Sequence, residues 1–367
     1  MRFILKKNWE DLRYTSSTLE ESLKDNTMAK IITFGEIMLR LMPEDGHRIL
    51  QTNQLEATFV GGEANVAVSL GNFGENVGYV TVLPENPVGQ AAINNMRYFG
   101  VDTTHVLRQG ARVGVYYVEK GQSQRPSKVI YDRKYSSISM AKASDFDWEA
   151  IFEGCKWFHF TGITPALSEE LAKACKDAVQ CAKKKGITVS CDLNYRKNLW
   201  STEQALATMS ELVPYVDVCI ANEEDAEKVL GIHATGTDVD TGKLSYEGYQ
   251  DVARKICERY GCKKVAITLR TSISANDNKW AGLLYDGKEF YRSKEYDIHI
   301  WDRVGGGDSF GAGLIYGMVH DLAPQETIDF AIAASCLKHT IQGDFNRVTL
   351  DEVRSLMGGN ASGRVQR

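Results

Sequence analysis

Short β-rich runs alternate with helical patterns along most of this 367-residue chain, and no other feature constrains its fold as much. Seven runs have the length and apolar character of buried strands, at 31–37, 77–83, 157–162, 187–193, 216–222, 265–270 and 281–286. Helical patterns lie at about 63–73, 88–99, 168–185, 202–212, 223–230, 247–260, 308–320 and 325–341. This rhythm predicts an α/β fold with a doubly wound, mostly parallel sheet and helices on both faces.

One region departs from that rhythm. Residues 113–119 and 127–134 are two β-rich runs joined by a polar loop that contains glycine and proline, with no helix between them. They predict a hairpin outside the main sheet. An excursion of this kind near a site is a candidate lid.

Charge and hydropathy exclude several classes of partner. The chain has 43 Lys and Arg against 48 Asp and Glu, a net charge of −5. It therefore lacks the excess of basic residues that is typical of nucleic-acid-binding proteins. Its longest apolar and glycine stretch, 310–319, is much shorter than the roughly 20 residues of a membrane-spanning helix. No secretory signal is recognisable, and the eight cysteines form no CxxC pair. We therefore expect a cytoplasmic protein without a membrane partner.

The two ends of the chain differ from its middle. Residues 1–27 are polar and stop just before the first strand, which predicts a flexible N-terminal extension; a partner-binding helix is the alternative. Residues 28–360 are expected to form the α/β domain, and 361–367 a C-terminal tail.

A run of three glycines is the strongest local signal. Gly305, Gly306 and Gly307 lead into an apolar helix whose first turn carries Asp308. Glycines let the backbone turn tightly with its N–H groups exposed, and a helix N-terminus adds partial positive charge, so the loop suits an anion. A carboxylate there can accept the proton of a hydroxyl that attacks a phosphoryl group. The alternative is that Asp308 only caps the helix and the glycines only turn the chain.

A second glycine cluster, Gly61-Gly62-Glu63-Ala64-Asn65, precedes the helix expected at 63–73. It is either another N-terminal turn or a source of backbone and amide contacts to a polyol.

These two clusters carry a family resemblance. GGEANVAVSLGNFG (61–74) and DRVGGGDSFGAGL (302–314) resemble the two signatures of the ribokinase-like, phosphofructokinase-B-type carbohydrate kinases, over roughly residues 30–357. The resemblance implies a three-layer α/β/α fold with a small β-lid built from elements near 38–60 and 108–136. DLNYRKNLW (192–200), VIYDRKYS (129–136) and ASCLKHTIQGDFNRVT (334–349) are similar to the family's kinases of 2-keto-3-deoxygluconate, also called 2-dehydro-3-deoxygluconate. They imply ATP-dependent phosphorylation of its 6-hydroxyl, giving 2-keto-3-deoxy-6-phosphogluconate.

The resemblance also implies roles for single residues. Asp308 matches the catalytic base, and Gly305, Gly306 and Gly307 match the anion hole. The expected substrate contacts are Gly61, Gly62, Asn65, Tyr116, Tyr131, Arg133, Arg196 and Asp308. The expected ATP contacts are Asn222, Thr268, Arg270, Gly305, Gly307, Lys338 and Asn346.

The family's magnesium motif usually reads Asn-x-x-Glu, and here it has Asn222 and Asp225. The shorter aspartate leaves open whether help to Mg²⁺ is direct or passes through water. Lid strands in this family often pair across subunits, so a homo-oligomer is expected.

Arginines favour an acidic acceptor. Many neutral-sugar kinases of the family carry an aspartate on or after the first strand, where this chain has GEIMLRL with Arg40. Arg133 and Arg196 could hold a carboxylate with paired N–H donors, although each could instead form a surface salt bridge. A kinase of fructose or ribose on the same fold is one alternative. A non-catalytic sugar-acid-binding regulator is another, and the presence of Asp308 disfavours it.

Overall fold

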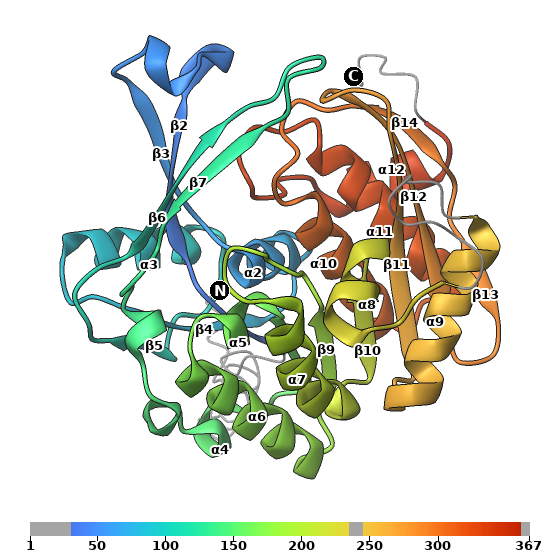
Figure 1. Ribbon diagram of the computed structural model, residues 1–367, viewed down its shortest axis with the longest axis horizontal. Helices are drawn as coiled ribbons and strands as arrows, with labels where there is room; N and C mark the ends of the chain where they lie inside the picture. Colours follow the sequence, from blue (N-terminus) through green and yellow to red (C-terminus); the bar gives the residue numbers. More distant parts are fainter. Residues whose placement is uncertain (1–30, 235–244, 361–367) are drawn as a thin grey trace, which may run out of the picture.

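The computed structural model describes residues 31–234 and 245–360. The predicted N-terminal extension, 1–27, and C-terminal tail, 361–367, lie outside the described residues. The described part consists of a large sheet between two helical layers and a smaller sheet that stands beside it (Figure 1).

The large sheet has ten strands, of which seven run parallel. Across the sheet these seven are β5 (Val106–Arg108), β4 (Val77–Leu83), β1 (Ile31–Phe34), β8 (Trp157–Thr161), β9 (Thr188–Asp192), β10 (Val218–Ala221) and β11 (Lys264–Ser272). The antiparallel part pairs β11 with β12 (Asp277–Tyr285), and β12 with both β13 (Phe290–Arg292) and β14 (Tyr296–His299). Since β4 and β8 flank β1, the strand order reverses there, as in a doubly wound fold.

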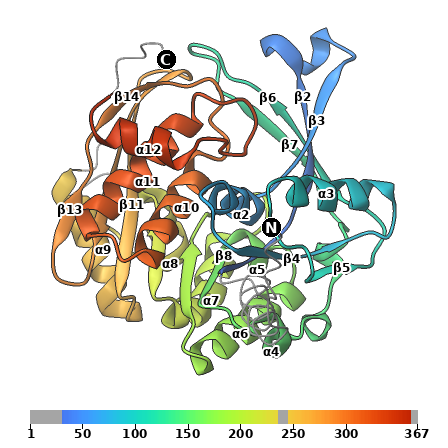
Figure 2. The same ribbon diagram turned by 180° about the vertical axis from the view of Figure 1, so that it is seen from behind.

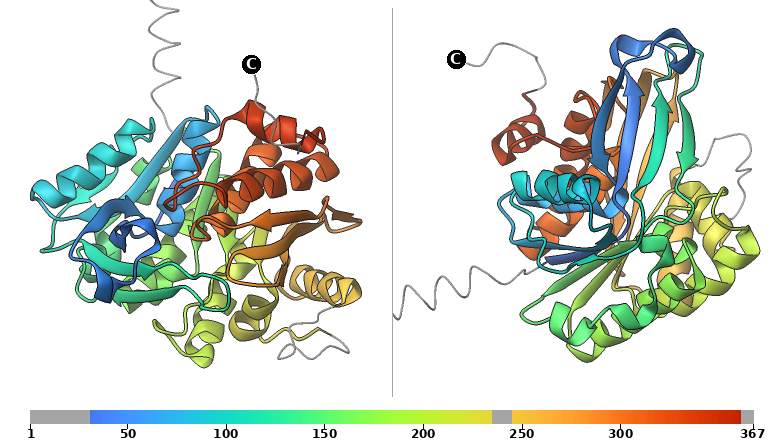
Figure 3. Two further views of the ribbon diagram at one scale, coloured as in Figure 1. Left: turned by 90° about the horizontal axis from the view of Figure 1, so that it is seen from above. Right: turned by 90° about the vertical axis from the view of Figure 1, so that its left-hand side faces the viewer.

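Helices cover both faces of this sheet (Figure 3). One layer contains α2 (Gly62–Asn72), α3 (Pro87–Tyr98), α10 (Gly306–Val319), α11 (Pro324–Lys338) and α12 (Leu350–Met357), which face the viewer in Figure 2. The other contains α6 (Glu169–Lys184), α7 (Thr202–Leu212), α8 (Glu223–Leu230) and α9 (Tyr246–Tyr260), with the one-turn helices α4 (Trp148–Ile151) and α5 (Ile163–Ala166). Short 3-10 turns lie at Glu44–Gly46, Ile49–Gln51, Ile138–Met140, Ala143–Asp145 and Val213–Tyr215.

Strand alternation divides the core between the two layers. In β4, Val80 and Val82 pack with the α6 layer, whereas Val77 and Tyr79 pack with the α2 layer. Both faces of these strands are buried, which explains their nearly continuous apolar sequences.

The smaller sheet has the order β3 (Leu55–Val60), β2 (Met38–Pro43), β6 (Gly114–Glu119), β7 (Lys128–Asp132). Strands β6 and β7 form the predicted hairpin, with Tyr116 opposite Tyr131, and β2 runs parallel to β6. These four strands, called the lid sheet below, rise beyond the helical layers (Figure 1). The four strands lie within the segments near 38–60 and 108–136 where the lid elements are expected.

The predicted fold class is confirmed. All seven predicted strands and all eight predicted helices are present, with ends shifted by a few residues. The short strands β5, β13 and β14 are not among the predictions. The eight cysteines are free thiols, and within 31–234 and 245–360 no helix is long and apolar enough to cross a membrane.

Candidate active site

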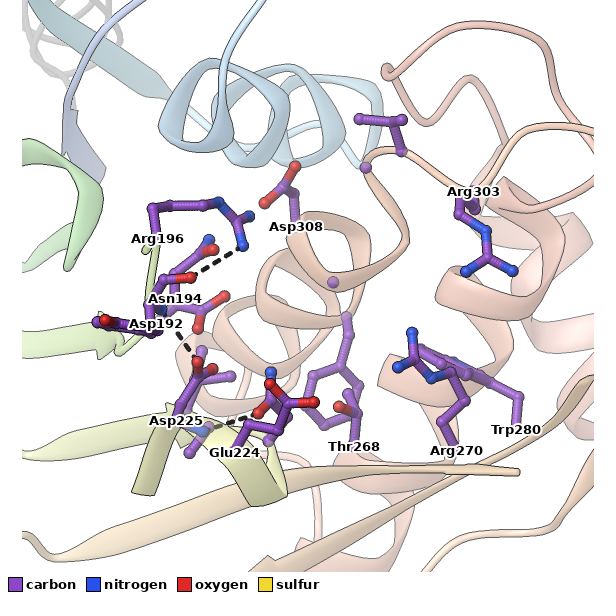
Figure 4. A pocket seen from close by; sticks show the side chains of 18 of the residues that line it. Asp192, Asn194, Arg196, Glu224, Asp225, Thr268, Arg270, Trp280, Arg303 and Asp308 are labelled. Atoms are coloured by element: carbon purple, nitrogen blue, oxygen red, sulfur yellow. Dashed lines mark hydrogen bonds between the residues drawn. The ribbon is translucent and has the colours of Figure 1, made fainter. Parts of the chain in front are cut away.

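A polar cleft of about 530 Å³ opens at the carboxyl ends of β9 and β10, beside the first turn of α10 (Figure 4). This is the edge at which parallel α/β sheets bind ligands. The lid sheet contributes Val129 and Tyr131 from β7, so the cleft lies between the lid and the main sheet.

Asp308 lies in the first turn of α10 and lines the cleft. Asn65, in the first turns of α2, donates from Nδ2 to Oδ2 of Asp308 at 2.6 Å. Burial raises the pKa of the Asp308 carboxyl to about 7, although the Asn65 hydrogen bond and the nearby Arg196 guanidinium oppose that rise. A carboxyl with this pKa exchanges protons readily near neutral pH.

The glycine loop is shaped by close packing on one side and open space on the other. Gly305 has φ +87°, and a Cβ on it would lie 2.0 Å from the backbone oxygen of Asp344. A Cβ on Gly306 would lie 2.4 Å from the ring of His339, whereas one on Gly307 would meet nothing within 4 Å. Gly305 and Gly307 line the cleft, and the first backbone N–H groups of α10 lie there without helical partners.

Carboxylates from two further elements flank Asp308. Asp192 ends β9, and Asp225 lies in the first turn of α8, which Asn222 caps by accepting the Asp225 N–H at 2.9 Å. One oxygen of Asp225 accepts the N–H of Tyr195 at 3.0 Å. Burial, with Asp225 and Asp308 close by, raises the pKa of Asp192 well above its usual value. Such oxygen-rich sites suit hard cations.

Three arginines face the same cleft: Arg196, Arg270 and Arg303 (Figure 4). None forms an ion pair with a carboxylate in the described part of the chain. Arg196 donates to the backbone oxygen of Tyr195 at 3.3 Å, and Arg303 to that of Ala275 at 3.0 Å. Burial and the neighbouring Arg270 lower the pKa of Arg303. These cations fit anionic ligands, Arg196 on the Asp308 side and the other two at the opposite end.

Several predicted ligand contacts lie in the cleft and others do not. The predicted contacts that line the cleft are Tyr131, Arg196, Asn222, Asp225, Thr268, Arg270, Gly305, Gly307 and Asp308. Gly61, Gly62 and Asn65 lie beside it at the start of α2, where a Cβ on Gly62 would lie 3.7 Å from Asp308.

Four predicted contacts are buried away from the cleft. Arg133 pairs with Glu36, its Nε lying 2.8 Å from Oε2. Tyr116 donates to Asp344 at 2.6 Å, and Lys338 donates to the backbone oxygen of Asp302 at 2.9 Å. Asn346 donates to the Ser309 hydroxyl at 2.6 Å and thereby supports the first turn of α10. As ligand contacts these four stay predictions.

The sequence reasoning missed part of the cleft surface. The missed polar and aromatic residues are Asp192, Asn194, Tyr195, Glu224, Asn278, Trp280, Arg303, Phe310 and His339. Asp192 could have been found, because it lies one residue before the end of the buried strand predicted at 187–193. Trp280 and His339 could not, since only the fold brings their rings together, with centroids 5.0 Å apart.

Comparison with known proteins decides the family. Residues 28–346 match the model of the pfkB family carbohydrate kinases. The chain belongs to this family. This pfkB kinase is 33% identical over 334 residues to the 2-dehydro-3-deoxygalactonokinase of Haloferax volcanii, which covers 91% of the chain and 98% of that relative.

Solved structures agree with the family. The 2-dehydro-3-deoxygluconokinase of Thermotoga maritima is 50% identical to this pfkB kinase, with a TM-score of 0.87 over 90% of this chain and 100% of that one. The fructokinase of Xylella fastidiosa, solved with bound ATP, has a TM-score of 0.71 at 20% identity over 91% and 100% of the two chains. The second likeness supports the fold alone.

Proposed function

We propose that this pfkB kinase transfers a phosphoryl group from MgATP to the 6-hydroxyl of 2-keto-3-deoxygluconate. The observation that carries the proposal is Asp308. It is a half-buried carboxyl with a pKa of about 7, beside a glycine loop at a helix N-terminus, in a cleft that also presents Arg196. A base, an anion cradle and a cation for an acidic acceptor are together in one cavity.

Arg196 is the better supported of the two arginines proposed to hold the acceptor carboxylate. Arg133 already has a buried carboxylate partner in Glu36, whereas Arg196 lines the cleft with only a backbone hydrogen bond. A planar guanidinium with unused N–H donors suits a substrate carboxylate. Tyr131 faces the same space from the lid sheet and could contact the sugar chain.

The donor end has the charges that a nucleotide requires. The N–H groups around Gly305 and Gly307, with Arg270 and Arg303, would hold the phosphates. Asp192, Glu224 and Asp225 line the cleft, and their carboxylate oxygens would assist Mg²⁺ through water, because among the described residues no three such side chains are close enough to hold the ion themselves. When bound, Mg²⁺ would neutralise charge on the phosphates.

Asp308 would accept the proton of the 6-hydroxyl while the oxygen of that hydroxyl forms a bond to the terminal phosphorus of ATP. The bond from that phosphorus to the bridging oxygen breaks, and ADP leaves with the electron pair. The backbone N–H groups at the start of α10 stabilise the negative charge on the transferred group. Asn65 holds the carboxyl of Asp308 in place during this step.

The second candidate acceptor is 2-keto-3-deoxygalactonate, the epimer of 2-keto-3-deoxygluconate, because the Haloferax volcanii relative is named as a kinase of this compound. The two sugar acids differ in configuration at one carbon and share the carboxylate that Arg196 would hold. The higher identity to the gluconokinase favours the gluconate form. A neutral acceptor would leave Arg196 without an anionic partner.

Release of ADP with MgATP tests the acceptor. We expect kcat/KM for 2-keto-3-deoxygluconate to exceed the values for its galacto epimer, gluconate, fructose and ribose. A higher value for the epimer would change the acceptor and keep the reaction. A higher value for fructose or ribose would overturn the sugar-acid assignment, and no turnover of any acceptor would favour a binding protein.

We further propose a cytoplasmic location and a homo-oligomer formed through the lid sheet. Strands β3 and β7 are its edges, so each has unpaired backbone groups available to another chain. On β7, the side chain of Ile130 is 44% exposed and does not line the cleft, so it is available to pack against another chain.

A further inference from the structure

A buried charge cluster joins the lid sheet to the main body outside the cleft. Arg40, on lid strand β2, is only 1% exposed. Its Nη2 lies 2.7 Å from Oδ2 of Asp302, and its Nη1 pairs with Oδ1 of Asp344. Tyr116, the neighbour of Arg40 on β6, donates to the other oxygen of Asp344 at 2.6 Å. Two lid strands therefore meet two aspartates of the main body.

Both aspartates hold the glycine loop. Asp302 begins the loop and accepts the N–H of Val304 through Oδ1 at 3.3 Å. Its other oxygen accepts the N–H of Gly343 at 3.1 Å. The backbone oxygen of Asp344 lies so close to Gly305 that a Cβ there would approach it to 2.0 Å. A movement of either aspartate would move the loop that is proposed to hold the phosphates.

The guanidinium suits this bridging role. It is planar and presents N–H donors in two directions, so Arg40 can bind two carboxylates at once, whereas a lysine ammonium is a compact charge on a flexible stem. Neighbouring Lys338 donates to the backbone oxygen of Asp302 at 2.9 Å, which adds a second cation to the cluster. Removal of one partner from a buried pair leaves an uncompensated charge, and the carboxylates are then expected to shift.

We propose that Arg40 is a positioning residue that couples the lid sheet to the glycine loop. An acceptor bound beneath the lid then strengthens nucleotide binding at the loop, and the nucleotide strengthens acceptor binding by the same factor. This inference rests on the proposed function, because it requires an acceptor and a nucleotide in one cleft.

Calorimetry on the full chain tests the coupling. The Kd of magnesium-bound AMP-PNP, a non-hydrolysable ATP analogue, is measured with and without saturating 2-keto-3-deoxygluconate, and the ratio of the two values is the coupling factor. We expect a factor of about five or more for the wild type, as for typical coupled sites. Arg40→Met should reduce the coupling factor to below about two. Arg40→Lys should give a coupling factor between that of Arg40→Met and that of the wild type.

Arg48→Met is the matched control. Arg48 is also a lid-region arginine, 3.0 Å from Glu119, but its side chain is 54% exposed and it contacts neither aspartate. Its loss should leave the coupling factor unchanged. A purely structural role for Arg40 would lower the Tm and leave the coupling factor at the wild-type value.

If Arg40→Met does not fold, Tyr116→Phe replaces it in the coupling measurement, because this substitution removes one hydrogen bond to Asp344 and no charge. We expect it to halve the coupling factor at least. The inference is overturned if folded Arg40→Met, or Tyr116→Phe in its place, keeps the wild-type factor, or if the wild type shows no coupling with an acceptor that it phosphorylates. If the wild type phosphorylates none of the acceptors tested, the proposed function itself has failed.

Discussion

Asp308 shows how burial prepares one carboxyl for proton transfer. Desolvation disfavours its charged form and raises its pKa to about 7, whereas Asn65 and Arg196 keep the charged form accessible. The sequence could predict Asp308 as a candidate base, from its position after the glycines together with the family resemblance. It could not give the pKa, because the residues that set it lie on other elements.

A base must be deprotonated to accept a proton, which fixes the sign of the pH dependence. We expect kcat/KM to rise about tenfold per pH unit below pH 7 and to level above it. Stability should change in the opposite sense. The unfolded carboxyl loses its proton near pH 4 and the folded one near 7, so this group makes the fold less stable as pH rises between those values.

Rate profiles and thermal melts between pH 4 and 9 check both signs. Asp308→Asn should abolish the fall in stability that this carboxyl causes. A flat kcat/KM between pH 5.5 and 7.5 would contradict the assignment of Asp308 as the base.

The sequence predicts the same role, binding of the substrate carboxylate, for Arg196 and Arg133. In the structure Arg196 lines the cleft, whereas Arg133 pairs with Glu36. Arg196→Ala should raise KM for the sugar acid by about 10- to 100-fold, the worth of a charge-assisted hydrogen bond, and leave the Tm nearly unchanged. Arg133→Ala should lower the free energy of unfolding by about 3–5 kcal/mol, because Glu36 would be left as a buried charge. Steady-state kinetics and denaturant melts of both variants separate the roles. Equal effects on KM would refute the distinction.

The glycine loop and α10 act together as one element. Gly305→Ala should destabilise the fold, because its φ of +87° costs about 1–2 kcal/mol for other residues and its Cβ would strike Asp344. Gly307→Ala should leave the Tm nearly unchanged, since its Cβ meets only open space, and raise KM for MgATP about tenfold or more by narrowing the anion site. If Gly307→Ala bound MgATP normally, the loop would not contact the phosphates.

The strands that are most deeply buried in the structure were the easiest to predict from the sequence. Continuous apolar runs identified the seven strands between two helical layers, because both of their faces must be apolar. Strand β14, Tyr296–His299, has one buried residue in four and therefore gives no such signal. The parallel pairing of β2 with β6 was also hidden, because it joins residues more than 70 positions apart.

At the scale of the whole molecule, the lid sheet has a free face as well as a face toward the cleft. Tyr131 lines the cleft, so Ile130 next to it on β7 points the other way. We expect light scattering to show a wild-type dimer or larger oligomer and Ile130→Lys to shift it toward the monomer. Val319→Lys, at an exposed position on α10, is the control. A monomeric wild type would rule out assembly through the lid.

The net charge of −5 gave no hint of a cleft for two anions. The groups proposed to bind them are local: Arg196 at one end of the cleft, Arg270 and Arg303 at the other, and helix N–H groups between. Bulk composition could exclude nucleic acid, but only the fold could bring these groups into one cavity.

The position of the new phosphate tests the central claim most directly. The wild type and Asp308→Asn are each incubated with MgATP and 2-keto-3-deoxygluconate, and the product is examined by ³¹P–¹H correlation NMR. The wild type should give one phosphomonoester coupled to the methylene protons of carbon 6, and Asp308→Asn should form it at least about 100-fold more slowly. A phosphate on another carbon, ATP consumption without a phosphomonoester, or equal rates for the two proteins would contradict the account.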